Sequence, residues 1–155
     1  MDLRGNAGGS LVSATATRDR FLRSEAELGF IRYSDGMGCL SSPTPLVAAP
    51  SESGRRWTGR LVVLTDPLTC AASEDFLLGL QGLDHVKVIG AATAGASGRP
   101  RSVKLLPGWE LTVSTALTYD RAGHCVEGSG IPVDVEADPY PTGGGDPALR
   151  AAARL

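Results

Sequence analysis

The spacing of apolar residues between positions 60 and 90 predicts a strand, a helix and a second strand. Residues 60–65 form a continuous apolar run rich in β-branched side chains, which is typical of a central strand covered on both faces. From about residue 71 to residue 83 the apolar positions follow helical spacing, and they are Phe76, Leu77, Leu80 and Leu83. Residues 86–90 form another short apolar run. A strand, a helix and a strand in so short a stretch predict a βαβ unit with parallel strands.

Weaker patterns before this unit predict a helix, a strand and a loop. Residues 10–23 carry their larger apolar side chains at positions that fit a helix. Residues 29–33 (Gly-Phe-Ile-Arg-Tyr) predict a strand, and Ser34-Asp35-Gly36 predicts the turn that ends it. Residues 41–56 hold three prolines, several serines and little periodicity, so they predict a surface loop or flap.

The remainder of the chain predicts a hairpin and a closing helix. A glycine-rich loop runs from residue 90 to 98, and residues 103–106 and 110–118 predict two strands around Pro107-Gly108. Near the end, Asp146 can cap a helix whose first position is Pro147.

Composition narrows the class of protein without naming a reaction. The 155 residues fit one domain, with 42% apolar and 21% charged residues, as in ordinary globular proteins. A net charge of −2 gives no electrostatic case for binding nucleic acid or an anionic membrane. No stretch approaches the apolar length of a membrane span, and the cysteines have neither zinc-like nor redox spacing: Cys39, Cys70 and Cys125. We therefore expect no metal and no cofactor.

Residues 64–76 (Leu-Thr-Asp-Pro-Leu-Thr-Cys-Ala-Ala-Ser-Glu-Asp-Phe) are the most informative segment. They predict a strand, a sharp turn and a helix that opens in two acids, an arrangement that can present a reactive side chain at a helix N-terminus. The segment resembles the nucleophile segment of the tail-specific (carboxyl-terminal-processing) serine peptidases, a family that includes the tricorn core protease. That family's pattern is Thr-x-Ser-Ala-(Ala/Ser)-Glu, and Ala71 stands at the position of its reactive serine.

Three further segments resemble the same family, in the same order along the chain. Residues 2–9 resemble its Asp-Leu-Arg-x-Asn-x-Gly-Gly turn, residues 89–98 its Gly-x-x-Thr-x-Gly loop, and residues 126–134 its Glu-Gly-x-Gly-Ile-x-Pro-Asp signature, with the proline one place early. The resemblance implies a crotonase-like α/β fold, a mixed layered sheet with βαβ units and flanking helices. It assigns residues 1–140 to the C-terminal part of a catalytic domain of the tricorn-like branch, and residues 141–155 to a linker and helix of the same domain.

The resemblance also implies roles for individual residues. Backbone N–H groups of Gly8 or Gly9 and of Ala72 would form the oxyanion hole. Glu74 would support the catalytic group, although an acid in the first turn of a helix is also stabilised by the helix dipole, and both roles can hold together. Glu127 would assist the site, as the corresponding glutamate does in the tricorn-like branch.

Two parts of the catalytic machinery are missing from this sequence. Ala71 cannot attack a carbonyl, and Ser73 is a weak alternative nucleophile, because it lies about 200° around the helix axis from that position; we expect it to face largely away from the cleft and to act as a helix residue or N-cap. The lysine-using branch places its base in the Thr-x-Gly loop, where this chain has none. Neither Lys87 nor Lys104 matches that position.

A histidine base is also missing from the matched positions. The tricorn-like branch carries this histidine upstream of the Asp-Leu-Arg turn. His85 and His124 match no family position, and we expect both to be solvated loop residues, with His124 an outside candidate because it lies near Glu127 in the sequence.

The sequence is compatible with three functions. The first is a serine-type peptidase domain that hydrolyses peptide or unfolded protein substrates, in which Ala71 is an engineered inactivation or a natural loss. The second is a catalytically dead relative that binds peptides or apolar ligands, and the third is a truncated fragment. The family has a buried strand where Met1 stands, and a sheet without it would expose unpaired backbone, so we expect a missing upstream segment or a homo-oligomer. No apolar leader follows Met1, which indicates a cytoplasmic protein as the chain stands and an extracytoplasmic one if a signal lies upstream.

Overall fold

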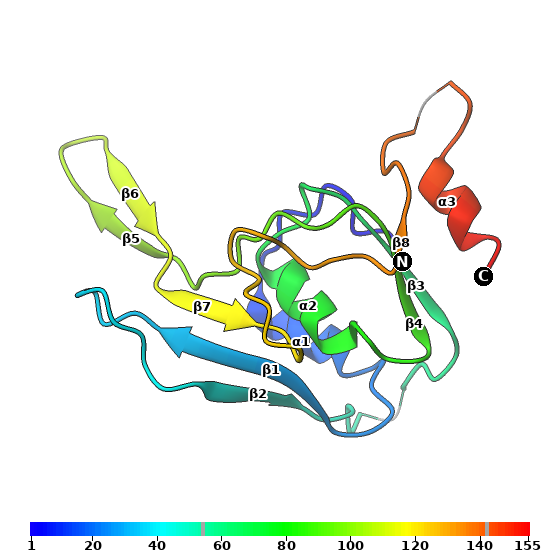
Figure 1. Ribbon diagram of the computed structural model, residues 1–155, viewed down its shortest axis with the longest axis horizontal. Coiled ribbons are helices and arrows are strands. Elements are labelled where there is room, and N and C mark those ends of the chain that lie inside the picture. The colour runs from blue at the N-terminus through cyan, green and yellow to red at the C-terminus, as the bar shows by residue number, and fades with distance from the viewer. Residues whose placement is uncertain (54, 142) are drawn as a thin grey trace.

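A parallel sheet carries the predicted βαβ unit. The computed structural model describes residues 1–53, 55–141 and 143–155 (Figure 1). Strands β3 (Leu61–Thr65), β4 (Val86–Gly90) and β8 (Val135–Glu136) pair in parallel in that order. Helix α2 (Ala72–Leu80) connects β3 to β4, which confirms the unit. On the free side of β3, Asp2 forms a parallel bridge with Leu64.

Two helices lie between this sheet and a second, antiparallel sheet (Figure 1). The second sheet has the order β2-β1-β7, with β1 at Ala26–Tyr33, β2 at Thr44–Ala48 and β7 at Ala116–Tyr119. Helix α1 (Leu11–Arg18) packs beside α2. The main core joins α2 to both sheets, and its members include Val63, Val88, Phe76, Leu77, Leu80 and Leu28.

Helix α3 (Pro147–Ala152) covers the opposite face of the parallel sheet. Side chains alternate between the two faces of a strand, so Val63 and Val88 face the main core, whereas Leu64 and Ile89 pack with Ala148 of α3. The predicted cap is confirmed, because the Asp146 carboxylate accepts from the Leu149 N–H at 2.9 Å.

Two loop and hairpin predictions needed correction. The predicted loop at 41–56 contains β2, where Pro45 is tolerated because β2 is an edge strand of its sheet. Strands β5 (Arg101–Lys104) and β6 (Glu110–Val113) form the expected hairpin, which projects from the body (Figure 1). The expected second strand at 110–118 is divided, however, because residues 116–119 leave the hairpin and pair with β1 as β7.

Among the residues that the structure describes, no helix is long and apolar enough to cross a membrane.

Candidate active site

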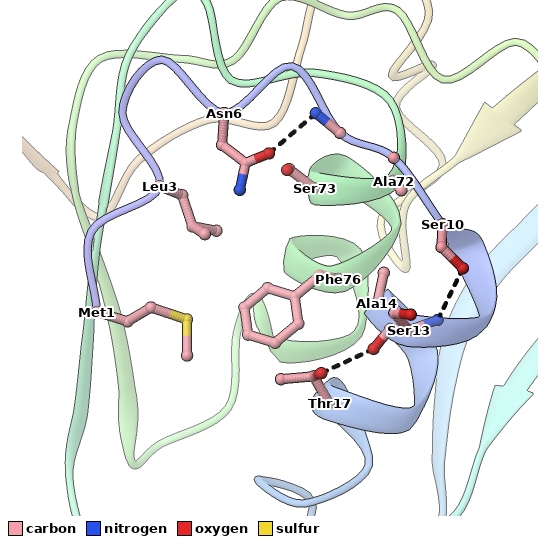
Figure 2. A pocket seen from close by; sticks show the side chains of 12 residues that line it. Met1, Leu3, Asn6, Ser10, Ser13, Ala14, Thr17, Ala72, Ser73 and Phe76 are labelled. Atoms are coloured by element: carbon pink, nitrogen blue, oxygen red, sulfur yellow. Dashed lines mark hydrogen bonds between the residues drawn. The ribbon is translucent and has the colours of Figure 1, made fainter.

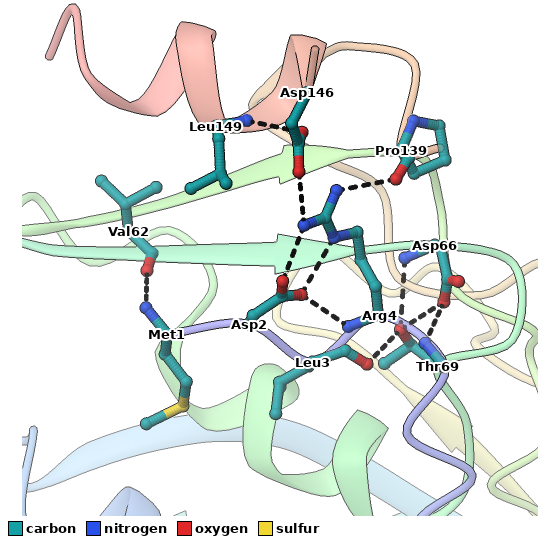
Figure 3. A network of polar contacts seen from close by, with 11 residues as sticks. Met1, Asp2, Leu3, Arg4, Val62, Asp66, Thr69, Pro139, Asp146 and Leu149 are labelled. Carbon is teal, nitrogen blue, oxygen red and sulfur yellow. Dashed lines mark hydrogen bonds and ion pairs between the residues drawn. The ribbon is translucent and has the colours of Figure 1, made fainter. Parts of the chain in front are cut away.

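The turn at residues 5–9 is fastened to the elbow between β3 and α2 by buried polar groups. Asp66 Oδ1 accepts from the Gly5 N–H at 3.0 Å and from the Thr69 hydroxyl at 2.9 Å. The same hydroxyl lies 2.9 Å from the Leu3 carbonyl (Figure 3), and both Asp66 and Thr69 are buried. The Cys70 N–H completes the link by donating to the Asn6 carbonyl at 3.1 Å.

Gly8 is held directly against Ala71. A Cβ atom on Gly8 would lie 2.8 Å from Ala71 Cβ, Ala72 N and Cys70 O, and the φ of Gly8 is +91°. Only glycine fits such an approach without strain. Ala71 itself has φ +54° and ψ −122°, an uncommon backbone conformation for a residue with a side chain. The turn and the elbow therefore meet at Ala71, the residue that the sequence resemblance aligns with the family's nucleophile.

Two backbone donors at this junction have no acceptor within the described residues. The Gly8 N–H is committed to Asn6 Oδ1 at 3.0 Å. The N–H groups of Gly9 and of Ala72, the first residue of α2, have no acceptor in the part of the chain that the structure describes. Of the two glycines expected to serve as donors, Gly9 is therefore the one whose N–H is uncommitted.

Glu74 faces a loop and is saturated with hydrogen bonds. The side chain is 1% exposed. Its carboxylate accepts from the Thr93 hydroxyl at 2.5 Å and from the N–H groups of Gly95, Ala96 and Ala71 at 2.7, 2.9 and 3.1 Å. Four donors satisfy the oxygens of this buried side chain. The carboxylate thus fixes the position of the elbow relative to the Thr93–Gly95 loop.

Ser73 faces a pocket, so the prediction that it turns away from the cleft was wrong. Figure 2 shows its hydroxyl beside Asn6, in a pocket of about 230 Å³ between α1, α2 and the N-terminal turn. The prediction failed because it placed Glu74 in the cleft, whereas Glu74 points into the loop and leaves the cleft side of the helix to its neighbour. The pocket is lined by Met1, Leu3, Asn6, Gly8, Gly9, Ser10, Ser13, Ala14, Thr17, Ala72, Ser73 and Phe76.

Glu127 holds the far end of the same glycine-rich loop. Its carboxylate accepts from the Ser97 N–H at 3.0 Å and from the Ser114 hydroxyl. The neighbouring Gly128 N–H donates to the Gly95 carbonyl at 2.7 Å. Glu74 and Glu127 therefore both accept hydrogen bonds from backbone N–H groups of the same loop. Among the described residues, neither glutamate forms a hydrogen bond or ion pair with a histidine or lysine.

The histidines lie away from the elbow, and one of them corrects a prediction. His85 was expected to be solvated, yet it is buried, with Nε2 lying 2.9 Å from the Phe21 carbonyl. It lies in the turn that connects α2 to β4. The His124 side chain is 77% exposed, as expected, and its Nδ1 lies 3.2 Å from Asp120 Oδ2.

Cys70 does not replace the missing hydroxyl. Burial, reinforced by the charge of Glu74, raises the pKa of the Cys70 thiol, which keeps it protonated and a poor nucleophile. Within the described residues no three His, Cys, Asp or Glu side chains gather as a metal site would require.

Several residues that build the site carry no motif in the sequence that we recognised. Arg4 lies within 2.8 Å of both Asp2 and Asp146 and donates to the Pro139 carbonyl at 2.7 Å, which joins the turn to the C-terminal segment (Figure 3). Arg99 forms a two-pronged ion pair with Asp75, both contacts 2.9 Å long. The Asp66-x-x-Thr69 spacing is a turn signal that could have been recognised, whereas both arginine contacts join segments far apart in the sequence.

Comparisons with known proteins identify the family. Residues 1–137 match the model of peptidase family S41. The fold is similar to that of an inferred peptidase from Parabacteroides merdae, with 31% identity, a TM-score of 0.88, and coverage of 99% of this chain but 50% of that one. It is also similar to the photosystem II D1 C-terminal processing protease (24% identity, TM-score 0.63, covering 90% of this chain and 34% of that one).

The tricorn protease is similar as well, with 19% identity, a TM-score of 0.61, and coverage of 99% of this chain and 14% of that one. Among curated proteins, none matches this sequence. The chain therefore spans 50% of the Parabacteroides merdae protein, 34% of the D1 C-terminal processing protease and 14% of the tricorn protease. The match over residues 1–137, together with the mixed α/β fold shared with these proteins, shows that the chain belongs to peptidase family S41.

Proposed function

We propose that this chain carries the carbonyl-binding part of a serine-type peptidase centre. Because Ala71 supplies no nucleophile, this centre binds a substrate and does not cleave it. One observation carries this proposal. The backbone at Ala71 keeps the sharp, positive-φ elbow of a nucleophile position, with Gly8 packed against it and the Ala72 N–H uncommitted beside it. Such a geometry costs conformational energy and serves a reactive side chain that this sequence no longer has.

The proposed chemistry follows from these groups. A peptide carbonyl seated over the Ala71 methyl would place its oxygen at the N–H groups of Ala72 and Gly9, where an oxyanion would be stabilised. Hydrolysis further requires a hydroxyl that bonds to the carbonyl carbon while a base takes its proton. A methyl group supplies neither a lone pair nor a proton, so in this chain the peptide bond stays intact.

A binding role is the second candidate, and the pocket beside the elbow favours it. About 230 Å³ remain between α1 and α2 next to the uncommitted donors, so a peptide can be held without being cleaved. The two candidates share the same ligand class, peptides or unfolded proteins, and they differ in whether the whole protein cleaves it. We propose further that residues 1–140 and 141–155 belong to one catalytic domain, since α3 packs on its sheet.

Labelling with a fluorophosphonate, a reagent that reacts with activated serine hydroxyls, tests the proposal. We expect no labelling of the natural chain and labelling at position 71 of Ala71→Ser combined with Ala96→Lys, which supplies the base that the sequence lacks. The control adds Gly8→Val to this double variant, whose side chain would collide with the elbow at 2.8 Å and should abolish labelling, with circular dichroism used to check that the variant is folded. Absence of labelling in the folded double variant would remove the mechanism. Labelling of Ser73 in the natural chain would instead show a relocated nucleophile.

A further inference from the structure

Two surface segments lie side by side at the end of α1 (Figure 1). The first, residues 19–25, follows α1, and the second, residues 55–60, leads into β3. The Trp57 N–H donates to the Arg20 carbonyl at 2.8 Å, and the Arg20 guanidinium donates to the Arg55 carbonyl at 3.3 Å. These contacts join parts of the chain that are 35 positions apart in the sequence.

Five exposed arginines lie on these two segments, and together with Trp57 they are called the arginine surface below. Arg23 lies 3.9 Å from Asp84, and within the described residues this is the one ion pair that any of the five arginines forms. Asp19, on the first segment, pairs instead with Arg18 at 2.8 Å. The five arginines are Arg20, Arg23, Arg55, Arg56 and Arg60.

Nearby acids leave this surface with an excess of positive charge. Glu25 and Glu52 are exposed and lie on or next to the two segments. Even if these two acids and Asp84 each neutralise one arginine, positive charge remains, on a chain whose net charge is −2. A local excess of one sign attracts a partner of the opposite sign, so the arginine surface favours a partner that carries negative charge.

Trp57 is an exposed aromatic residue whose ring is held in place. The residue is 55% exposed, and its Nε1–H donates to the Arg60 carbonyl at 3.1 Å. The indole also lies against Gly59, where an added Cβ would be 3.0 Å from Trp57 Cζ2. A ring that is already fixed loses little conformational freedom on binding, and tryptophan and arginine are among the residue types enriched at binding hot spots.

The chemistry of this surface favours the carboxylates of a protein over the phosphates of a nucleic acid or a bilayer. A guanidinium group binds a carboxylate through two parallel hydrogen bonds. A nucleic acid or an anionic membrane presents closely spaced charges that would also meet Glu25, Glu52 and Asp84, and domains that bind nucleic acid usually carry a net positive charge. A flexible acidic peptide can place its carboxylates at the arginines and away from these three acids.

We infer that the arginine surface docks an acidic, extended segment of a protein, with carboxylates on the guanidinium groups and one apolar side chain against the Trp57 ring. This site goes beyond the proposed function, because it lies past the other end of α2 from the elbow. Asp84, which contacts Arg23, follows α2, whereas the elbow precedes it. The nine residues of α2 span about 13 Å, so a segment docked here lies outside the pocket at Ser73.

Fluorescence titration with a short acidic peptide tests the inference. The probe is acetyl-Asp-Glu-Glu-Phe-Glu-Glu-Asp-amide, and the matched peptide carries asparagine and glutamine in place of the acids. The chain has two tryptophans, so Trp109→Phe leaves the emission of Trp57 as a direct report of this surface. We expect the acidic peptide to change this emission and to bind at least about tenfold more tightly than the amide peptide. Raising NaCl from about 50 to 500 mM should weaken its binding strongly, because salt screens exposed charges.

Two pairs of substitutions assign the binding to the arginine surface. Arg55→Gln with Arg56→Gln should weaken binding of the acidic peptide by about tenfold, since two guanidinium groups are lost from the contact. The matched control, Arg101→Gln with Lys104→Gln, removes the same charge from exposed strand β5 and should change the affinity by less than about twofold, since charges this far from the contact are screened.

The comparison of the acidic peptide with the amide peptide requires no substitution among the arginines. Equal affinity for the two peptides, or binding that leaves the Trp57 emission unchanged, would overturn the inference, as would equal losses in the two pairs of variants. Tighter binding of a ten-nucleotide oligothymidine or of phosphatidylserine vesicles, compared at equal concentrations of negative charge, would overturn the choice of an acidic protein segment as the partner. Labelling at position 71 tests the proposed function separately, and none of these outcomes affects it.

Discussion

Ala71 and Ala96 donate their backbone N–H groups to the same oxygen atom, Glu74 Oε2, at 3.1 and 2.9 Å. The two nitrogens are therefore no farther apart than the sum of these distances, although 25 positions separate the residues in the sequence. Ala96 is exposed and lies in the loop where the lysine-using branch of the family carries its base. A side chain introduced at 96 would begin close to one introduced at 71.

We expect Ala71→Ser combined with Ala96→Lys to hydrolyse an activated ester at least 100-fold faster than Ala71→Ser alone. General-base assistance typically contributes about 10²–10⁴-fold, and the rate should rise with pH as the lysine loses its proton. Steady-state hydrolysis of a nitrophenyl ester between pH 6 and 10 measures both. The control is Ala94→Lys, an exposed position two residues away whose N–H donates to Thr69. Equal rates for the two lysine variants would contradict the geometric argument.

Gly8→Ala should destabilise the fold by about 3 kcal/mol, because a methyl group would collide with three atoms of the elbow at 2.8 Å and the φ of +91° would add strain. Gly5→Ala is the matched control, with φ +69° and no atom within 4 Å of the added Cβ, and it should cost about 1 kcal/mol. Urea unfolding followed by circular dichroism measures both. A similar loss for both variants would mean that the turn is not packed against the elbow.

Glu74→Gln should also cost about 3 kcal/mol, since an amide nitrogen would face backbone donors that now meet a carboxylate. If the amide nitrogen replaces Oε2, it faces the N–H groups of Ala71 and Ala96. If it replaces Oε1, it faces the Thr93 hydroxyl and the Gly95 N–H. Hydrogen exchange should show the loop at 93–96 losing protection together with the start of α2. Exposed Glu110→Gln on β6 should change neither measurement. Retention of loop protection in Glu74→Gln would show that other contacts hold the elbow.

The Arg4 network should make stability depend on acid. The Arg4 hydrogen bond, helped by that of the Leu149 N–H, lowers the pKa of Asp146 from its ordinary value of 3.8, and the Arg4 hydrogen bond likewise lowers that of Asp2. A lowered folded-state pKa contributes stability that is fully present above the ordinary value and is lost as the pH falls through the folded value. Urea midpoints between pH 2 and 7 should therefore fall below about pH 4.

Asp146→Asn should reduce stability at pH 7 and flatten this acid dependence, whereas Glu25→Gln, at an exposed acid, should leave the curve unchanged. An equally steep acid dependence in Asp146→Asn would assign it to other carboxylates.

Much of the fold follows from local pattern, and the departures have physical causes. The apolar runs of β3 and β4 specify buried parallel strands, and the spacing of Phe76, Leu77 and Leu80 specifies the buried face of α2. Strand β2 was missed because Pro45 is a strong loop signal, and only the sheet order reveals that β2 is an edge. β8, two residues long, carries no periodicity that a sequence could show.

The candidate site likewise has parts that the sequence predicts and parts that depend on distant contacts. The resemblance located the elbow, the glycine turn and both glutamates by residue number, and the structure brings Gly8, Ala71 and Ala72 into contact. The direction of each side chain around the start of α2 was not predictable, because it depends on where Glu74 finds donors, and those lie 19 to 22 residues further along. The prediction that His85 is exposed was wrong for the same reason, because its hydrogen-bond partner, Phe21, lies 64 residues away in the sequence.

The positive φ of Ala71 has a consequence for how the site could be altered. Backbone strain of about 1 kcal/mol or more persists at an alanine, while glycine would adopt the same conformation freely. The main-chain shape is thus maintained by its surroundings, chiefly Glu74 and Gly8, and does not depend on a reactive side chain at this position. Under the proposed function, hydrolysis would therefore require the exchange of a few side chains and no change in the backbone.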